Sequence, residues 1–184
     1  MEKIIPSRGI RRACSIRGQS GFTLIELLVT VAIAAIVLAI AVPNYITLVQ
    51  NSRLTGQAND FVTALNYARS EAIKRGVRVT VCSRSTDAAC ANDINWDAGW
   101  LVFVDTDGDG DVDGETVLLV RPPLENGNSL RAAVRQRVTY QNTGYSGFAD
   151  TFRLCDTRGT TSGRAIAVNL QGRVSTTVGT ASCP

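Results

Sequence analysis

Acidic side chains are concentrated in one segment, residues 105–115, in which six of the eleven residues are Asp or Glu. Its first six residues follow the pattern that opens a calcium-binding loop, where alternate aspartates direct oxygen atoms at the ion. The candidate ligands are Asp105, Asp107, Asp109 and, at the ninth position, Asp113. The twelfth position is Thr116 rather than a bidentate glutamate, so an EF-hand is not expected. A hydrated, glycine-rich hairpin turn is the alternative, and the sequence indicates no other cofactor.

The cysteines favour disulfide bonds over metal binding or catalysis. The chain has five cysteines and no histidine, which removes the usual partner of a nucleophilic serine or cysteine. Four of them follow the apolar segment described below and would pair in an oxidising compartment; they are Cys82, Cys90, Cys155 and Cys183. Three connectivities are allowed, and we favour Cys82–Cys90 with Cys155–Cys183 because each bond joins sequence neighbours. Zinc is disfavoured because CxxC spacing is missing, and we expect no enzyme.

Arginine is the third candidate for chemistry, because its guanidinium group binds phosphate. Eight arginines lie beyond residue 120: Arg121, Arg131, Arg135, Arg137, Arg153, Arg158, Arg164 and Arg173. The first 21 residues hold five of the 19 basic residues and one of the 16 acidic residues, so the remaining chain has a net charge of −1. Bulk electrostatics therefore do not favour nucleic acid as a partner. Hydrated strand faces with local ion pairs are the alternative.

Glu26 is the one carboxylate in a run of 21 nearly all apolar residues, 22–42, that follows a basic leader, residues 1–21. As a helix this run would be about 31 Å long, enough to cross a membrane once. A secretory signal is cut after its apolar region, whereas the cut expected here, between Gly21 and Phe22, would retain it. Because the flanking leader is cationic, we expect the leader in the cytoplasm and the rest of the chain outside.

A carboxylate inside a membrane usually marks function and needs a cationic partner. Cleavage would create an amine at Phe22, and the amine of a neighbouring subunit is our candidate partner for Glu26. A simple membrane anchor, with Glu26 near the interface, is the alternative.

Helical periodicity continues beyond the apolar run. Apolar residues recur at steps of three and four from Leu54 to Ala72, and Gly76 follows two basic residues as a stop signal. We therefore predict one helix from Phe22 to Arg75, kinked near Pro43. It would consist of a membrane-spanning segment at 22–42 and an amphipathic half at 43–76.

Short alternating runs predict strands in the remainder, residues 77–184. The fold class is α+β, with the amphipathic half of the helix packed on an antiparallel β domain. The expected strands are 77–81, 100–104, 116–120, 134–140, 152–155, 165–170 and 173–178.

The start of the apolar run resembles the type IV pilin class of precursors, in which a basic leader ends in Gly before Phe-Thr-Leu-Ile-Glu-Leu. Gly21 and all six following residues match this pattern, residues 22–27. The resemblance implies that a prepilin peptidase cleaves after Gly21 and N-methylates Phe22. It also implies that Glu26 helps to dock the subunit beside the N-terminus of its neighbour in a filament.

The body resembles the GspH/FimT family, which includes the H-type pseudopilins of type II secretion and the FimT- and FimU-like minor pilins. The matching features are residues 64–72, Trp96, residues 99–103, the acidic segment and Gly172-Arg173. The resemblance implies a structural subunit of the bacterial inner membrane, with its C-terminal domain in the periplasm. With other pilins as partners, it would help to initiate or cap a type II secretion pseudopilus or a type IV pilus.

Some relatives used in natural transformation bind DNA through a late Gly-Arg-x-Arg. In this chain Ser175 replaces the second arginine, which would remove a phosphate contact. A DNA-binding minor pilin therefore remains the alternative function, with Arg173 as its candidate contact.

Overall fold

The computed structural model describes residues 21–179, 182 and 183 of the 184-residue chain. All but the last residue of the predicted leader, 1–21, lies outside this range. The described residues form two compact units that meet between residues 44 and 45, and this boundary falls within helix α1, Leu24–Arg75. Helical structure is continuous over 52 residues and includes Pro43.

The first and last turns of α1 are satisfied by local hydrogen bonds. The backbone N–H of Glu26 donates to Thr23 Oγ1 at 3.3 Å, so Thr23 caps the N-terminus. At the other end, Gly76 donates its N–H to the Ala72 carbonyl at 3.0 Å and has a φ of 71°. Glycine reaches this left-handed conformation without steric cost, which explains why the helix ends there.

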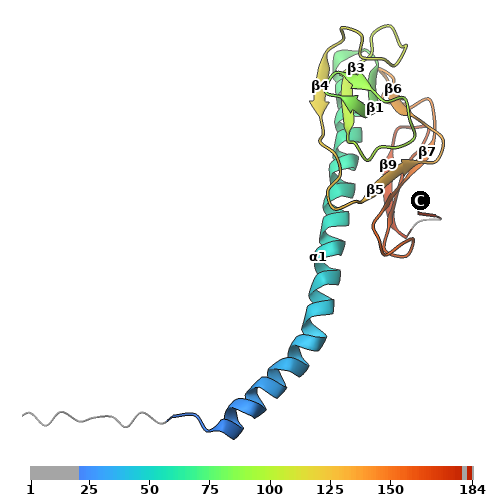
Figure 1. Ribbon diagram of the computed structural model, residues 1–184. Coiled ribbons are helices and arrows are strands. Elements are labelled where there is room, and N and C mark those ends of the chain that lie inside the picture. Colours follow the sequence, from blue (N-terminus) through green and yellow to red (C-terminus); the bar gives the residue numbers. More distant parts are fainter. Residues whose placement is uncertain (1–20, 180–181, 184) are drawn as a thin grey trace, which may run out of the picture. The chain divides into compact units, whose positions relative to one another are not determined.

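In the described part of the chain, nine strands form two antiparallel sheets beside the second half of α1 (Figure 1). In the first sheet the order is β2-β1-β3-β4, and β6 also pairs with β1. Its strands are β1 Val79–Thr86, β2 Ala89–Cys90, β3 Trp100–Val104, β4 Val117–Val120 and β6 Arg137–Tyr140. The second sheet has the order β5-β7-β8-β9. Its strands are β5 Ser129–Ala132, β7 Asp150–Cys155, β8 Arg164–Val168 and β9 Val174–Val178.

The α+β class and the antiparallel pairing agree with the prediction from sequence. The main differences are that β2 and β5 were not predicted, that β1 runs to Thr86 instead of ending at residue 81, and that the segment expected as one strand at 134–140 becomes a strand only from Arg137. The residues before it are held in a bend, because Asp150 Oδ2 accepts hydrogen bonds from the backbone N–H groups of Val134 and Arg135.

The core lies between the second half of α1 and the two sheets. Phe61 is fully buried and packs edge-on against the rings of Trp96, Trp100 and Phe152, with centroids 5.5, 5.0 and 4.8 Å away. Alanines along the same helical stripe let the sheets approach closely; Ala58, Ala64, Ala68 and Ala72 are all buried. The predicted stripe is therefore the face that packs.

Arg158 attaches the loop after β7 to α1. Its guanidinium donates from Nη1 to Asn51 Oδ1 at 2.9 Å and from Nη2 to Asp156 Oδ2 at 2.7 Å. Burial of Asp156 alone would raise the pKa of its carboxyl. Hydrogen bonds from the side chain and backbone of Arg158 outweigh that effect and hold the pKa below its usual value.

Replacing Asp156 with asparagine should lower the free energy of unfolding by about 1–3 kcal/mol near neutral pH, because charge-assisted hydrogen bonds are lost. The folded pKa lies below the unfolded value, which is about 3.9 for Asp. This contribution is therefore complete above the unfolded value and is lost as the pH falls through the folded one. Urea unfolding of both proteins should show a difference that shrinks in acid, and a pH-independent difference would contradict this account.

Candidate functional site

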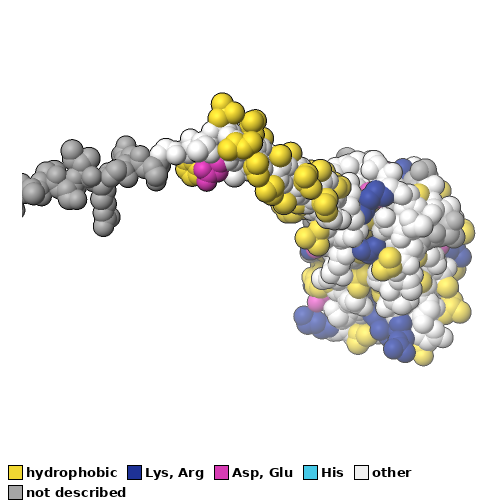
Figure 2. Space-filling model, turned by 90° about the horizontal axis from the view of Figure 1, so that it is seen from below, with side chains coloured by type: hydrophobic (Ala, Val, Ile, Leu, Met, Phe, Trp, Pro, Cys, Tyr) yellow, Lys and Arg dark blue, Asp and Glu magenta, His cyan; other side chains and the backbone are white. Residues whose placement is uncertain are grey.

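The first half of α1 presents its apolar side chains to the outside. Every residue from Gly21 to Leu48 is exposed, and Phe22 and Leu24 are 82% and 77% exposed. Hydrophobic side chains cover this part of the helix in Figure 2. By length and composition, it is the one helix in the described residues that could cross a membrane. Such a surface needs lipid or other protein to cover it.

Glu26 occupies the first turn of this helix, three residues after the cap Thr23. Thr-x-x-Glu is the pattern of a capping box, and a carboxylate here is favoured by the helix dipole. Within the part of the chain that the structure describes, no side chain forms an ion pair with Glu26. Glu26 was predicted from the sequence as a functional residue and Thr23 was not, although the Thr-x-x-Glu spacing indicates the cap.

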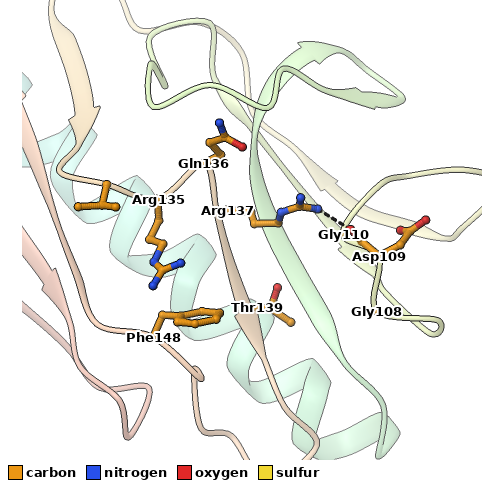
Figure 3. Close-up of a pocket in the computed structure, with 9 residues that line it drawn as sticks. Gly108, Asp109, Gly110, Arg135, Gln136, Arg137, Thr139 and Phe148 are labelled. Carbon is orange, nitrogen blue, oxygen red and sulfur yellow. Dashed lines mark hydrogen bonds between the residues drawn. The ribbon is translucent and has the colours of Figure 1, made fainter.

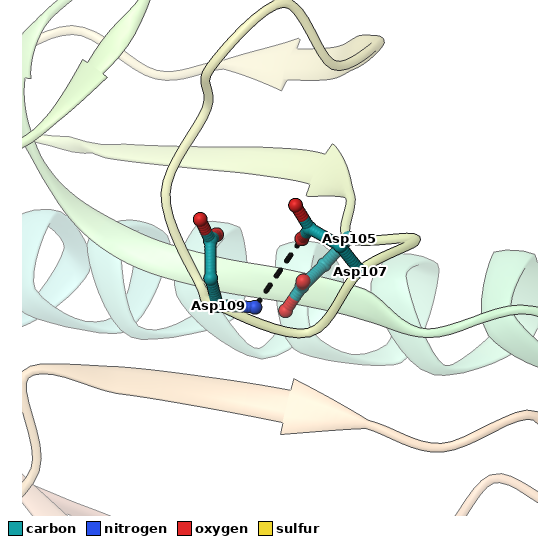
Figure 4. A group of neighbouring side chains, drawn as sticks. All are labelled: Asp105, Asp107 and Asp109. Atoms are coloured by element: carbon teal, nitrogen blue, oxygen red, sulfur yellow. Dashed lines mark hydrogen bonds between the residues drawn. The ribbon is translucent and has the colours of Figure 1, made fainter.

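The acidic segment forms a loop between β3 and β4 that brings three of the four predicted ligands together. One carboxylate oxygen from each of Asp105, Asp107 and Asp109 lies within 4.8 Å of the others (Figure 4). Asp113 is exposed and does not belong to this group. The physical reason is Val112, which is buried against Phe103 and anchors the chain between the two parts of the loop.

Asp105 differs from the other two because it is only 1% exposed. Its Oδ2 accepts a hydrogen bond from Thr80 Oγ1 at 2.6 Å, while its Oδ1 is buried without a hydrogen-bond partner in the described structure. A buried carboxylate oxygen left unpaired is costly. This atom therefore points to a missing partner, for which a cation is one candidate.

Two arginines hold the backbone of the same loop. Arg78 Nη2 donates to the Asp107 carbonyl at 2.9 Å, and Arg137 Nη1 donates to the Asp109 carbonyl at 2.6 Å. Their guanidinium groups lie where a side chain at Gly108 or Gly110 would be, and both glycines have positive φ. The two arginines therefore place positive charge beside the aspartates. This contact could not be predicted from sequence, because Arg78 and Arg137 are distant in sequence from the loop that they hold.

The structure contains the Cys82–Cys90 and Cys155–Cys183 disulfide bonds, which is the connectivity that the sequence favoured. The first bond joins β1 to β2 inside the smaller core cluster. The second joins the end of β7 to the C-terminal tail.

Comparison with known proteins decides the family. A family model described as type II transport protein GspH matches residues 57–172, which is more than half of the chain. The chain belongs to the GspH family. A second model, the prokaryotic N-terminal methylation motif, matches residues 16–42 and so includes the predicted cleavage site and Glu26.

Individual relatives agree with this assignment. Two proteins of Pseudomonas aeruginosa named fimbrial protein are 30% identical over 126 residues, covering 64% of this chain and 77% of theirs. Two crystal structures of the type IV minor pilin FimU from the same species match with TM-scores of 0.59 and 0.56 at 18% identity. They cover 74% and 71% of this chain and 99% of the FimU chains, and they confirm the pilin-like fold. The family and its structural neighbours are structural pilins, not enzymes.

Residues 64–72, which suggested the GspH family from sequence, have a structural role. Arg69 donates from Nε to the Gly144 carbonyl at 2.9 Å and from Nη2 to the Gln171 carbonyl at 3.1 Å. Gly172, with a φ of 72°, lies so close to the Gly144 carbonyl that a side chain would overlap it. Packing therefore requires glycine at position 172, whether or not Arg173 binds a ligand.

Arg173 itself is exposed immediately before β9, and among the described residues only its backbone is engaged. Its N–H donates to Asn169 Oδ1 at 2.9 Å, and its carbonyl accepts the Asn169 N–H at 3.1 Å. Several of the other arginines named as candidate phosphate ligands bind groups of this chain. Arg131 forms an ion pair with Asp97, Arg158 forms one with Asp156, and Arg164 donates a hydrogen bond to the Ser162 carbonyl. These contacts agree with the local ion pairs that the sequence analysis gave as the alternative to DNA binding.

Proposed function

We propose that this GspH-family protein is a minor filament subunit that helps to initiate or cap a type II secretion pseudopilus or a type IV pilus. The observation that carries the proposal is the exposed apolar half of α1, residues 24–48, most of which lies within the methylation-motif match at residues 16–42. The second unit has its own core and needs no contribution from residues 21–48 to bury it. The likeness to FimU, described as a type IV minor pilin, supports the same role.

In this proposal, the chain is first an inner-membrane protein with its C-terminal domain in the periplasm. A prepilin peptidase cleaves between Gly21 and Phe22 and N-methylates the new terminus. Glu26 then pairs with the Phe22 amine of a neighbouring pilin. The pair forms among apolar side chains, where an unpaired charge would be strongly disfavoured, so it sets the depth at which the subunit enters the filament.

Replacing Glu26 with glutamine should leave cleavage intact but reduce the amount of the protein in sheared filaments several-fold. Glutamine keeps the size of the side chain and removes the charge that pairs with the amine. Mass spectrometry of the mature N-terminus checks the cleavage, and immunoblotting of filament fractions checks incorporation. Asp60→Asn, an exposed change on the same helix, is the matched control.

Unchanged incorporation of Glu26→Gln would contradict the role of the ion pair, and Met1 retained in the mature membrane protein would contradict the pilin assignment. A clean deletion, scored in parallel for secreted enzymes and surface pili, then decides which of the two machines the subunit serves.

We infer a second property, calcium binding by the loop that holds Asp105, Asp107 and Asp109. The unpaired, buried Oδ1 of Asp105 favours it, and carboxylate oxygens are the ligands that calcium prefers. Two neighbouring guanidinium groups already place positive charge here. We therefore expect weak binding, in the range of about 0.1–1 mM found for extracellular modules.

Calcium at about 1 mM should raise the melting temperature of the protein relative to EDTA, because a ligand that binds only the folded state stabilises it. Asp105→Asn should abolish the rise, while Asp113→Asn should keep it, since Asp113 lies outside the group. A melting temperature that is the same in calcium and EDTA would contradict calcium binding by this loop.

A further inference from the structure

A groove of about 390 Å³ lies between the acidic loop and the start of β6. Figure 3 shows residues 108–110 on one side, Arg135 and Phe148 on the other, and Arg137 reaching towards the Asp109 carbonyl. The groove shares Asp109 with the aspartate group, but Val134, Arg135 and Phe148 belong neither to that group nor to the exposed half of α1.

The guanidinium of Arg135 has a fixed position in the groove. Its Cζ lies 3.9 Å from the centroid of the Phe148 ring. The backbone below it is held by Asp150, whose Oδ2 accepts the Arg135 N–H at 2.7 Å. Across the described ranges, no hydrogen bond or ion pair engages the guanidinium itself. A guanidinium that is positioned in advance and retains free N–H groups is suited to bind a carboxylate through two parallel hydrogen bonds.

The charges around the groove favour one carboxylate over a polyanion. Arg135 and Arg137 contribute two positive charges, and Asp109 and Asp150 contribute two negative charges. Nucleic acid, whose affinity depends on neutralising many phosphates, gains no net attraction from such a balanced set. A single carboxylate at the free N–H groups of Arg135 does gain net attraction, because it lies directly against that positive charge.

The polarity of the rim points to a peptide. Val134 and Phe148 are 71% and 51% exposed, and both line the groove. Apolar side chains next to one fixed charge are typical of a small interface that binds protein. A peptide segment with one Asp or Glu beside an apolar residue satisfies both the charge and the apolar surface.

We propose that this groove binds a segment of a neighbouring filament subunit, in which one carboxylate pairs with Arg135 and an adjacent apolar side chain packs on Phe148 and Val134. The inference rests on the proposed function, because the filament is what brings a second subunit to this surface. It gives the globular unit a lateral contact separate from the Glu26 contact of the helix.

The probe is the peptide acetyl-leucyl-glutamyl-leucinamide, titrated into the full mature chain in detergent micelles. NMR follows the Arg135 Nε–H signal and the ring signals of Phe148. We expect saturable shifts of both signals, and about tenfold weaker binding of the matched glutaminyl peptide, because the charged hydrogen bonds are lost. Arg135→Gln should remove the difference between the two peptides, whereas Arg173→Gln, an exposed arginine outside the groove, should retain it.

Equal binding of the two peptides, or unshifted Arg135 and Phe148 signals in a folded protein, would overturn the proposal. A short oligothymidylate that shifts these signals more strongly than the glutamyl peptide would also overturn it, in favour of a nucleic-acid site. Phe148→Leu keeps an apolar side chain but removes the ring below Arg135, so it should weaken the glutamyl peptide without unfolding the protein. The titration needs no filament, so its failure is distinguishable from a failure of the proposed function in cells.

Discussion

Replacing Phe61 with alanine should lower the free energy of unfolding by about 3–5 kcal/mol, the range found when a buried aromatic side chain is truncated. Phe61 is fully buried and contacts Trp96, Trp100 and Phe152, which belong to different parts of the β domain. Alanine would leave a cavity where the helix meets both sheets. The edge-on ring contacts, which add stability beyond the buried area, would also be lost.

Urea unfolding followed by tryptophan fluorescence measures this change directly, because the two tryptophans of the chain are both neighbours of Phe61. Tyr145→Ala is the matched control: it also truncates an aromatic ring, but that ring is 55% exposed, so we expect a change below about 1 kcal/mol. Similar losses for the two variants would mean that Phe61 is not at the centre of the core.

Removing the Cys155–Cys183 bond, by changing both cysteines to alanine, should cost about 3.6 kcal/mol in the chain-entropy description of disulfides. The bond closes a loop with a sequence separation of 28, whereas Cys82–Cys90 closes one of only 8. A longer loop has more freedom in the unfolded chain, so its closure stabilises more. The alanine pair at positions 82 and 90 gives the comparison, with about 2.6 kcal/mol expected from loop closure.

Urea unfolding with and without a reductant checks both numbers, because a reductant should destabilise the wild type and have a smaller effect on each double variant. Limited proteolysis gives a second measurement, since the C-terminal tail should become cleavable when position 183 is no longer attached to β7. A loss below about 1 kcal/mol for the 155–183 pair would indicate that the tail is held mainly by other contacts.

Features encoded within short stretches of sequence were predictable here. The stripe from Leu54 to Ala72 predicted the buried helix face, and the stop at Gly76 predicted the end of α1, because both depend on neighbours within one or two turns. The favoured cysteine pairs could be chosen by proximity in sequence. The family resemblance rested on the same local motifs.

Features that depend on contacts between distant residues were not predictable. Nothing near residues 105–115 indicates that Arg78 and Arg137 hold the loop backbone, or that burial of Val112 separates Asp113 from the other aspartates. Likewise, the division into two sheets follows from how β5 pairs with β7. A hydrophobic pattern gives the face of a strand but not its partner.

The exposed first half of α1 has a consequence for how a subunit changes its surroundings. Within the described residues, every position from Gly21 to Leu48 is exposed, so in the proposed role an exchange of lipid for neighbouring helices would not require these side chains to separate from the β domain. The free-energy difference between the two locations then depends on the environments alone: the bilayer composition on one side and the packing of adjacent helices on the other. In the filament role that we propose, the subunit would therefore leave or re-enter the membrane without any refolding step.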